Sequence, residues 1–251
     1  MSNMKTIYKV PSPIAKRDTS YCPGCTHGVA HRLIAELLEE MDLTKKTVIV
    51  WPVGCAVLGY YFIETDALEA AHGRACAMAT GVKRVHPETF VLTYQGDGDI
   101  ASIGIAETIH AAARGENITT VFINNGNYGM TGGQMAPTTL IGQVTTTSPY
   151  GRKPEMNGFP IHLPEMLATM DGPAYIARGA LDNTQHILQA KKFLKKAFNT
   201  QLKGLGYALV ELVSNCPTNW KMTPVESLER IRKEVLPVFP IGEFRVVKGV
   251  E

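Results

Sequence analysis

"TFVLTYQGDGDIASIG", residues 89 to 104, decides the fold, because an apolar run ends in an acidic, glycine-rich turn that opens a helix. The first seven residues are typical of a buried β-strand. A helix that begins after a strand offers free backbone N–H groups and the positive end of its dipole, and both favour a phosphate. Glycines allow the backbone to approach an anion closely, but the Asp97 carboxylate would repel one. The stretch therefore indicates a cation such as Mg²⁺ between Asp97 and a phosphate.

Strand-like and helix-like segments alternate along the rest of the chain, which predicts an α/β fold with a doubly wound, mostly parallel sheet. The expected strands are residues 47–54, 89–95, 118–125, 173–178 and 207–213, and the expected helices are 26–43, 69–85, 103–114, 164–170 and 183–203. Residues 126–160 show no clear periodicity and exceed ordinary loop lengths, so they are functional or hide short elements. Without repeats or linkers, we expect one domain over residues 1–251, with terminal extensions that pack on partner subunits.

Composition excludes several classes of protein. Of the 251 residues, 45% are hydrophobic and 19% charged, and the net charge of +2 indicates no nucleic-acid or membrane surface. No stretch is long and apolar enough to span a bilayer, which takes roughly 20 residues. The N-terminal "MSNMKTIYKVPSP" has no apolar core of a secretory signal, so we expect a cytoplasmic protein. Because structural disulfides are rare there, the five cysteines indicate metal or redox sites.

A second polar turn, "INNGNYG" at residues 123–129, follows the next expected strand. Neighbouring parallel strands would bring Asn124 and Asn125 beside Asp97. An amide oxygen is a suitable Mg²⁺ ligand that adds no charge. Each turn by itself is also typical of a simple chain reversal, because Asp-Gly and Asn-Gly are common turn formers.

Cys22 and Cys25 form a CxxC motif within "YCPGCTHG". Such a motif suits a thiol–disulfide couple, half of a zinc site, or part of an iron–sulfur site. Zinc would need two further ligands, for which His27 and His31 are candidates on the following helix.

The remaining cysteines differ in their position along the expected elements. Cys55 and Cys216 each follow an expected strand, so both can gather at the carboxyl edge of the sheet. Cys76 lies within an expected helix among Ala and Met, where a buried, inert thiol is expected.

Six motifs in order, from residue 22 to residue 220, resemble the β subunit of the 2-oxoacid:ferredoxin oxidoreductases, of the 2-oxoisovalerate/2-oxoglutarate type. They are "CPGCTHG", "VGCAV", "AAHGRA", "GDGDIASIG", "NNGNYGMTGGQ" and "CPTNW". Within them, the GDG, a spacing of 25 residues and then Asn-Asn resemble the thiamine diphosphate motif. The resemblance implies the thiamine diphosphate-binding fold (diphosphate-binding domain), with thiamine diphosphate, Mg²⁺ and a [4Fe–4S] cluster as cofactors.

The resemblance also implies a set of site residues. The metal ligands would be Asp97, Asn125 and the backbone carbonyl of Asn127 for Mg²⁺, and Cys22, Cys25, Cys55 and Cys216 for the cluster. The cofactor-binding residues would be Gly54, Cys55, His72, Gly96, Asp97, Gly98, Asp99, Asn125, Asn127, Gly129, Met130 and Thr131. The catalytic candidates are His72, for a diphosphate oxygen or the substrate carboxylate, and Arg74, for the diphosphate charge. Alternatively, both side chains satisfy local backbone groups.

The implied reaction converts a 2-oxoacid, coenzyme A and oxidised ferredoxin into acyl-CoA, CO₂ and reduced ferredoxin. The implied partners are an α subunit carrying the pyrimidine-binding domain, γ and ferredoxin-like δ subunits or fused equivalents, and ferredoxin. We therefore expect the isolated chain to be inactive.

Substrate choice is predicted from Leu58, three residues after the third cluster cysteine. Relatives that act on 2-oxoglutarate or pyruvate often carry Lys or Arg there, so an apolar residue favours a branched-chain acid such as 2-oxoisovalerate. The alternatives are a 2-oxoglutarate-specific member, a non-redox decarboxylase split into two chains, and a zinc-stabilised nucleotide-binding module. Four cysteines weigh against the decarboxylase, and the spaced "NNGNYGMTGGQ" weighs against the zinc module.

Overall fold

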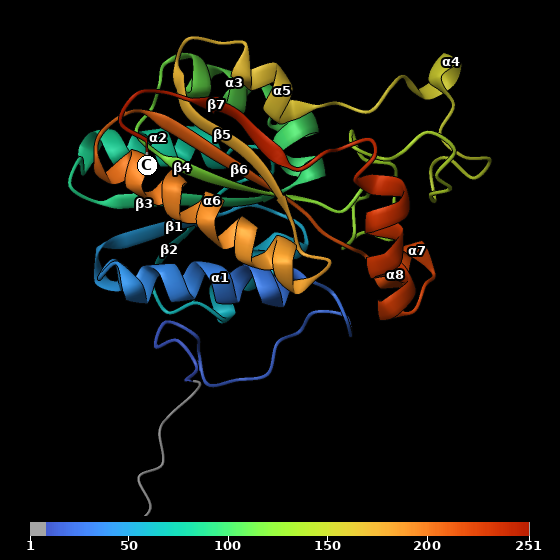
Figure 1. Cartoon of the computed structure of the whole chain (residues 1–251), viewed down its shortest axis with the longest axis horizontal. Helices are drawn as coiled ribbons and strands as arrows, with labels where there is room; N and C mark the ends of the chain where they lie inside the picture. The colour runs from blue at the N-terminus through green and yellow to red at the C-terminus, as the bar shows by residue number, and fades with distance from the viewer. Residues whose placement is uncertain (1–8, 251) are drawn as a thin grey trace, which may run out of the picture.

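The computed structural model describes residues 9–250, so part of the N-terminal stretch considered above, residues 1–8, lies outside the described chain. Within that range seven strands form one sheet of order β2-β1-β3-β4-β6-β5-β7 (Figure 1). Neighbouring strands are parallel except for the antiparallel pair of β5 and β7. The strands are β1 (Thr47–Trp51), β2 (Asp66–Glu69), β3 (Phe90–Gly96), β4 (Thr119–Asn124), β5 (Pro173–Ala180), β6 (Tyr207–Val213) and β7 (Gly242–Val246). The doubly wound, mostly parallel α/β prediction is confirmed.

Helices cover both faces of the sheet, which explains why the central strands are continuous apolar runs rather than alternating ones. The helices are α1 (His27–Glu40), α2 (Ala75–Val85), α3 (Ile105–Ala113), α4 (Pro154–Asn157), α5 (Leu163–Ala168), α6 (Thr184–Leu202), α7 (Pro217–Trp220) and α8 (Pro224–Arg230). On one face α1 and α6 pack through Leu37 and Phe198 against Leu92 and Val210. On the other, α2, α3 and α5 pack against strand residues such as Phe122. Figure 1 shows α7 and α8 beyond the end of the sheet.

Two strands were not predicted, and one predicted helix is too long. Residues 69–85 form a helix only from Ala75, because β2 and a turn occupy the preceding residues. All four residues of β2 are exposed, and "DALE" carries no β-branched side chain. β7 is also an edge strand with no fully buried residue. Pairing with a neighbour creates both edge strands, and a sequence pattern does not encode such pairing.

The 126–160 segment does hide short elements, as expected: α4 and several isolated bridges. Between Gly98 and Gly104 the chain makes a π-helical turn before α3 begins. Such turns often occur at functional sites. Across residues 9–250, none of the helices combines the length and apolar character needed to cross a membrane.

Candidate functional site

The loops that follow β3, β4 and β6 meet at the carboxyl edge of the sheet. Gly96 at the end of β3 pairs with Ile123, and Asn124 at the end of β4 pairs with Val213. The backbone groups of Asn125 and Gly126 lie close enough to the Asp97 carboxylate to lower its pKa. The acidic turn and the asparagine pair are therefore adjacent, as expected from parallel neighbours.

Asp97 is a buried carboxylate whose hydrogen-bond partners are neutral donors. Its Oδ1 accepts from the Gly98 N–H at 2.8 Å, and its Oδ2 accepts from the Thr138 hydroxyl at 2.7 Å. Burial raises the pKa of Asp97 to about 6, even though these hydrogen bonds lower it. A buried carboxylate of this kind is stabilised by a bound cation, so the donor set suits Mg²⁺.

A cavity of ≈ 80 Å³ lies over Asp97. It is lined by His27, Val53, Gly54, Cys55, Ala56, His72, Gly96, Asp97, Gly98, Asp99, Asn125, Asn127, Tyr128, Gly129, Met130 and Thr131. Every cofactor-binding residue expected from the sequence lines this cavity. A larger groove of ≈ 910 Å³ lies elsewhere, between residues 140–144, Phe159 and the C-terminal helices, and is mostly apolar. The smaller cavity is therefore the candidate site, and its size suits the diphosphate end of a cofactor better than the whole molecule.

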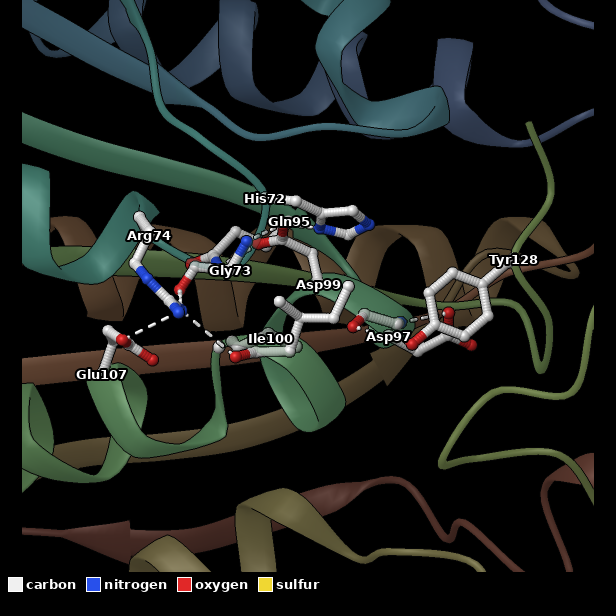
Figure 2. Close-up of polar contacts among 12 residues, drawn as sticks. His72, Gly73, Arg74, Gln95, Asp97, Asp99, Ile100, Glu107 and Tyr128 are labelled. Atoms are coloured by element: carbon white, nitrogen blue, oxygen red, sulfur yellow. Dashed lines mark hydrogen bonds and ion pairs between the residues drawn. The ribbon is translucent and has the colours of Figure 1, made fainter. Parts of the chain in front are cut away.

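The structure separates His72 from Arg74, which the sequence paired as catalytic candidates. His72 lines the cavity and its Nδ1 lies 2.5 Å from Asp99 Oδ1. The Arg74 guanidinium turns away and pairs with Glu107 at 2.9 Å (Figure 2). It also donates to the Ile103 carbonyl. Arg74 is not among the lining residues, because its charge is engaged on the far side of the turn. The guanidinium instead satisfies local backbone carbonyls, which is the alternative that the sequence left open, and its contact with a diphosphate stays a prediction.

The two asparagines of the pair also face different surroundings. Asn124 donates from Nδ2 to the buried Glu211 at 2.6 Å, beneath the site. Asn125 lines the cavity, and its Oδ1 accepts from the Asn127 N–H at 3.2 Å. This division leaves Asn125 as the residue placed to ligate a metal beside Asp97.

Gly98 has no room for a side chain, since a Cβ there would lie 2.1 Å from the Tyr128 ring. Tyr128 also donates from its hydroxyl to the Gly98 carbonyl at 3.2 Å. Gly96, two residues earlier, would meet nothing within 4 Å. The two glycines of the motif therefore serve different purposes: one admits Tyr128, and the other leaves the cavity open.

This difference gives a matched pair of variants. We expect Gly98→Ala to lower the free energy of unfolding by about 1–3 kcal/mol, because the ring must shift in a packed site. Gly96→Ala should change it by less than about 1 kcal/mol. Urea denaturation of both variants measures the difference, and equal stabilities would show that Tyr128 moves freely.

The cysteines expected at the cluster lie around one region of the same edge. Burial raises the pKa of the Cys25 thiol to about 12 and that of the Cys55 thiol to about 11, and the nearby Cys216 and Cys22 raise both pKa values further. A Cβ on Gly129 would lie 3.1 Å from Cys55 Sγ and 3.7 Å from Cys216 Sγ, so Gly129 sits between these two sulfurs. Cys76, by contrast, is buried and donates to Gln95 at 3.2 Å, away from the other four.

No three His, Cys, Asp or Glu side chains among residues 9–250 surround a common point as ligands of one metal ion. A single zinc ion needs four close ligands, whereas a four-iron cluster takes one thiolate for each iron. Among the described residues, the two zinc candidates form no ligand group with the cysteines: His27 stacks on Tyr21, and His31 packs edge-on against Tyr94.

Two residues at the site were not among the expected cofactor-binding residues. Asn219 of "CPTNW" donates from Nδ2 to the Gly129 carbonyl at 2.9 Å and to Cys216 Sγ at 3.3 Å. His27 lines the cavity, and its Nδ1 lies 2.7 Å from the Tyr94 hydroxyl. Burial lowers the pKa of His27 to about 4, so this imidazole is neutral near pH 7. Both residues belong to motifs quoted above, but their contacts depend on distant parts of the chain.

Comparisons with known proteins agree with this geometry. The family described as "Thiamine pyrophosphate enzyme, C-terminal TPP binding domain" matches residues 53–212. The ketoisovalerate oxidoreductase subunit VorA of Methanothermobacter thermautotrophicus is 47% identical over 228 residues, which are 90% of this chain and 48% of the relative. The 2-oxoglutarate synthase subunit KorB of Archaeoglobus fulgidus is 34% identical over 215 residues, which are 86% of this chain and 76% of the relative.

A solved structure is also similar: the 2-oxoglutarate:ferredoxin oxidoreductase from Magnetococcus marinus, with 2-oxoglutarate, coenzyme A and succinyl-CoA bound. The TM-score is 0.80 at 25% identity, over 98% of this chain and 88% of that chain. The present chain spans about half the length of the VorA relatives.

Proposed function

Because this chain belongs to the thiamine diphosphate-binding subunits of the 2-oxoacid:ferredoxin oxidoreductases, we propose that it carries the catalytic site for oxidative decarboxylation of a branched-chain 2-oxoacid. One 2-oxoacid and coenzyme A give acyl-CoA and CO₂, and the two electrons released reduce two ferredoxins. The observation that carries this proposal is the buried Asp97 beside Asn125 in a glycine-lined cavity whose wall includes Cys55, with Cys22, Cys25 and Cys216 near that cysteine.

The residues of the cavity fit thiamine diphosphate and Mg²⁺. Asp97 and Asn125 supply oxygen ligands, with the backbone carbonyl of Asn127 as a third. Gly96 leaves the backbone open to an anion, since a Cβ there would meet nothing within 4 Å. When bound, thiamine diphosphate supplies the carbanion stabilisation that decarboxylation of a 2-oxoacid requires.

The four cysteines fit a [4Fe–4S] cluster. Cys22 is exposed, whereas Cys216 is 9% exposed and receives the hydrogen bond from Asn219. Such a bond to a ligand sulfur tunes the reduction potential of a cluster. The cluster region thus extends from the cavity wall at Cys55 to the surface at Cys22, which suits electron transfer out of the site.

The proposed partners complete what the described chain does not provide. An α subunit with the pyrimidine-binding domain would close the cavity, and γ and ferredoxin-like δ subunits or fused equivalents would relay electrons to ferredoxin. The length of the VorA relatives, about twice this chain, is compatible with further domains in the working enzyme.

We expect the assembled enzyme to turn over 2-oxoisovalerate at least about tenfold more efficiently than 2-oxoglutarate. The higher identity to the ketoisovalerate subunit, 47% against 34%, supports this preference. The half-buried, apolar Leu58 also supports it, although Leu58 does not line the cavity of the described chain. Anaerobic kcat/KM measurements with both acids, and with ferredoxin as acceptor, test the expectation. Leu58→Lys should lower the ratio of kcat/KM for 2-oxoisovalerate to kcat/KM for 2-oxoglutarate. A preference for 2-oxoglutarate would instead assign the chain to the alternative substrate.

A further inference from the structure

We propose that Asp99 is a positioning residue for His72: its carboxylate fixes the imidazole as the Nδ1–H tautomer and directs an unprotonated Nε2 into the cavity as a hydrogen-bond acceptor. The identity of the cavity's ligand rests on the proposed function, but the tautomer does not. The sequence groups Asp99 with the cofactor-binding residues; Asp99 does line the cavity, and its contacts add a role toward His72.

Asp99 is 2% exposed and receives three hydrogen bonds from the protein. Its Oδ1 accepts from His72 Nδ1 at 2.5 Å and from the Gly73 N–H at 2.6 Å. Its Oδ2 accepts from Gln95 Nε2 at 2.6 Å. Both carboxylate oxygens are engaged inside the protein, so Asp99 acts on the cavity through His72.

The tautomer of His72 follows from the identity of the other donors. A backbone N–H such as that of Gly73 can only donate. The Gln95 amide is oriented independently, because its Oε1 accepts from the Cys76 thiol at 3.2 Å and its Nε2 therefore faces Asp99. Asp99 thus acts as an acceptor toward its neighbours, and a short contact with His72 requires a proton on Nδ1. In the neutral form of the ring, the lone pair is therefore on Nε2.

The backbone around His72 is fixed by the same turn. Gly73 has φ = 77°, and a Cβ there would lie 2.6 Å from the Gly104 nitrogen and 2.7 Å from the Ile103 carbonyl carbon. The loop before α2 is therefore docked against the π-helical turn that Asp99 begins. Figure 2 shows the His72 ring with one nitrogen toward Asp99 and the other on the opposite side. Position and protonation of the ring are set together, as in other oriented catalytic histidines.

The first measurement is the tautomer itself. A long-range ¹H–¹⁵N spectrum of the ¹⁵N-histidine-labelled full chain, at about pH 8.5, distinguishes the protonated from the unprotonated ring nitrogen of each neutral histidine. His72→Gln assigns the resonances. We expect wild-type His72 to carry its proton on Nδ1. A proton on Nε2 overturns the proposal without any activity measurement.

Two substitutions then separate the acceptor from the bulk of the side chain. Asp99→Asn keeps the bulk of the side chain but replaces one acceptor oxygen by an NH₂ group, which meets either the Gln95 amide or His72 and Gly73 as a second donor. We therefore expect kcat of this variant to fall by about tenfold or more. Asp99→Leu removes the acceptor. We expect the proton to move to Nε2 and kcat of the assembled enzyme to fall about 10²-fold or more, with the affinity for thiamine diphosphate changed less than about threefold.

The control is Asp182→Asn. Asp182 is likewise buried and lies 2.6 Å from Nδ1 of a histidine, His186, but at the start of α6. The Asp182→Asn variant should leave kcat of the assembled enzyme unchanged. Wild-type kcat in Asp99→Leu, or a loss of cofactor affinity as large as that of kcat, overturns the positioning role. If Asp99→Leu does not fold, the wild-type tautomer still decides. A wild-type enzyme without 2-oxoacid-dependent ferredoxin reduction contradicts the proposed function alone and leaves the tautomer result intact.

Discussion

Asp97→Asn is expected to weaken Mg²⁺-dependent binding of thiamine diphosphate by at least about 10²-fold, and with it to abolish turnover. The neutral amide removes the negative charge from a buried position where a divalent cation would sit. Calorimetric titration of the assembled enzyme with thiamine diphosphate, with and without Mg²⁺, measures the loss. Asp182→Asn, a buried carboxylate outside the cavity, should bind like wild type. Unchanged affinity in Asp97→Asn would remove Asp97 from the metal site.

The same substitution has a second consequence, which separates loss of binding from loss of structure. Burial raises the pKa of Asp97 in the folded chain to about 6, above its ordinary value of 3.8. Between these values the folded state binds more protons than the unfolded state, so the stability of the metal-free chain falls as pH rises through the window. Across the whole window, the free energy of unfolding of the metal-free chain falls by about 3 kcal/mol.

Asp97→Asn lacks this titration, so its stability should decline less than that of wild type between about pH 4 and pH 6. Urea denaturation of both metal-free chains at several pH values tests this. Parallel pH profiles would mean that the Asp97 carboxyl is not buried in the metal-free protein.

Cys216→Ser is expected to remove most of the iron, about four atoms per chain, together with ferredoxin reduction. Cys216 brings the C-terminal part of the chain to the cluster region, where its sulfur lies next to Gly129 and accepts from Asn219. Iron and acid-labile sulfide analysis under strict anaerobiosis, together with a visible spectrum, measures the effect.

The chain offers its own control for this experiment. Cys76→Ser changes a buried thiol that bonds to Gln95 and is not one of the four proposed ligands, so the iron content should stay at the wild-type level. Zinc in place of iron in anaerobically prepared wild-type protein, or no metal at all, would contradict the redox function and favour the split decarboxylase. Equal iron in Cys216→Ser and wild type would reject Cys216 as a ligand.

Much of the fold could be predicted because its central strands are buried on both faces. β3, β4 and β6 are apolar runs bounded by polar turns, and the order of strand and helix then indicates a parallel sheet. The edge strands β2 and β7 were not predicted because they lack such apolar runs. Their conformation comes from hydrogen bonding to a neighbour, which lies elsewhere in the chain.

The candidate site, like the fold, could be predicted from the sequence only in part. Asp97 and Asn125 follow directly from where two parallel strands end, so sequence position places them correctly beside one another. The direction of a side chain does not follow from that position. Arg74 turns to Glu107, and Asp99 is engaged by Gln95 and His72, because those partners lie on other segments whose orientation only the packed structure fixes.

Hydrogen bonds between the N-terminal and C-terminal parts of the described chain affect the order in which the protein can fold and take up cofactors. Asn215 accepts from the Thr26 N–H and donates to the Gly24 carbonyl, which joins the CxxC loop to the segment after β6 across about 190 residues. β6 itself inserts between β4 and β5, near the middle of the sheet. Contacts so distant in sequence form late and slowly during folding. For the proposed cluster, a nascent chain without Cys216 would offer three of the four proposed ligands, so we expect cluster insertion to follow release of the C-terminal part from the ribosome.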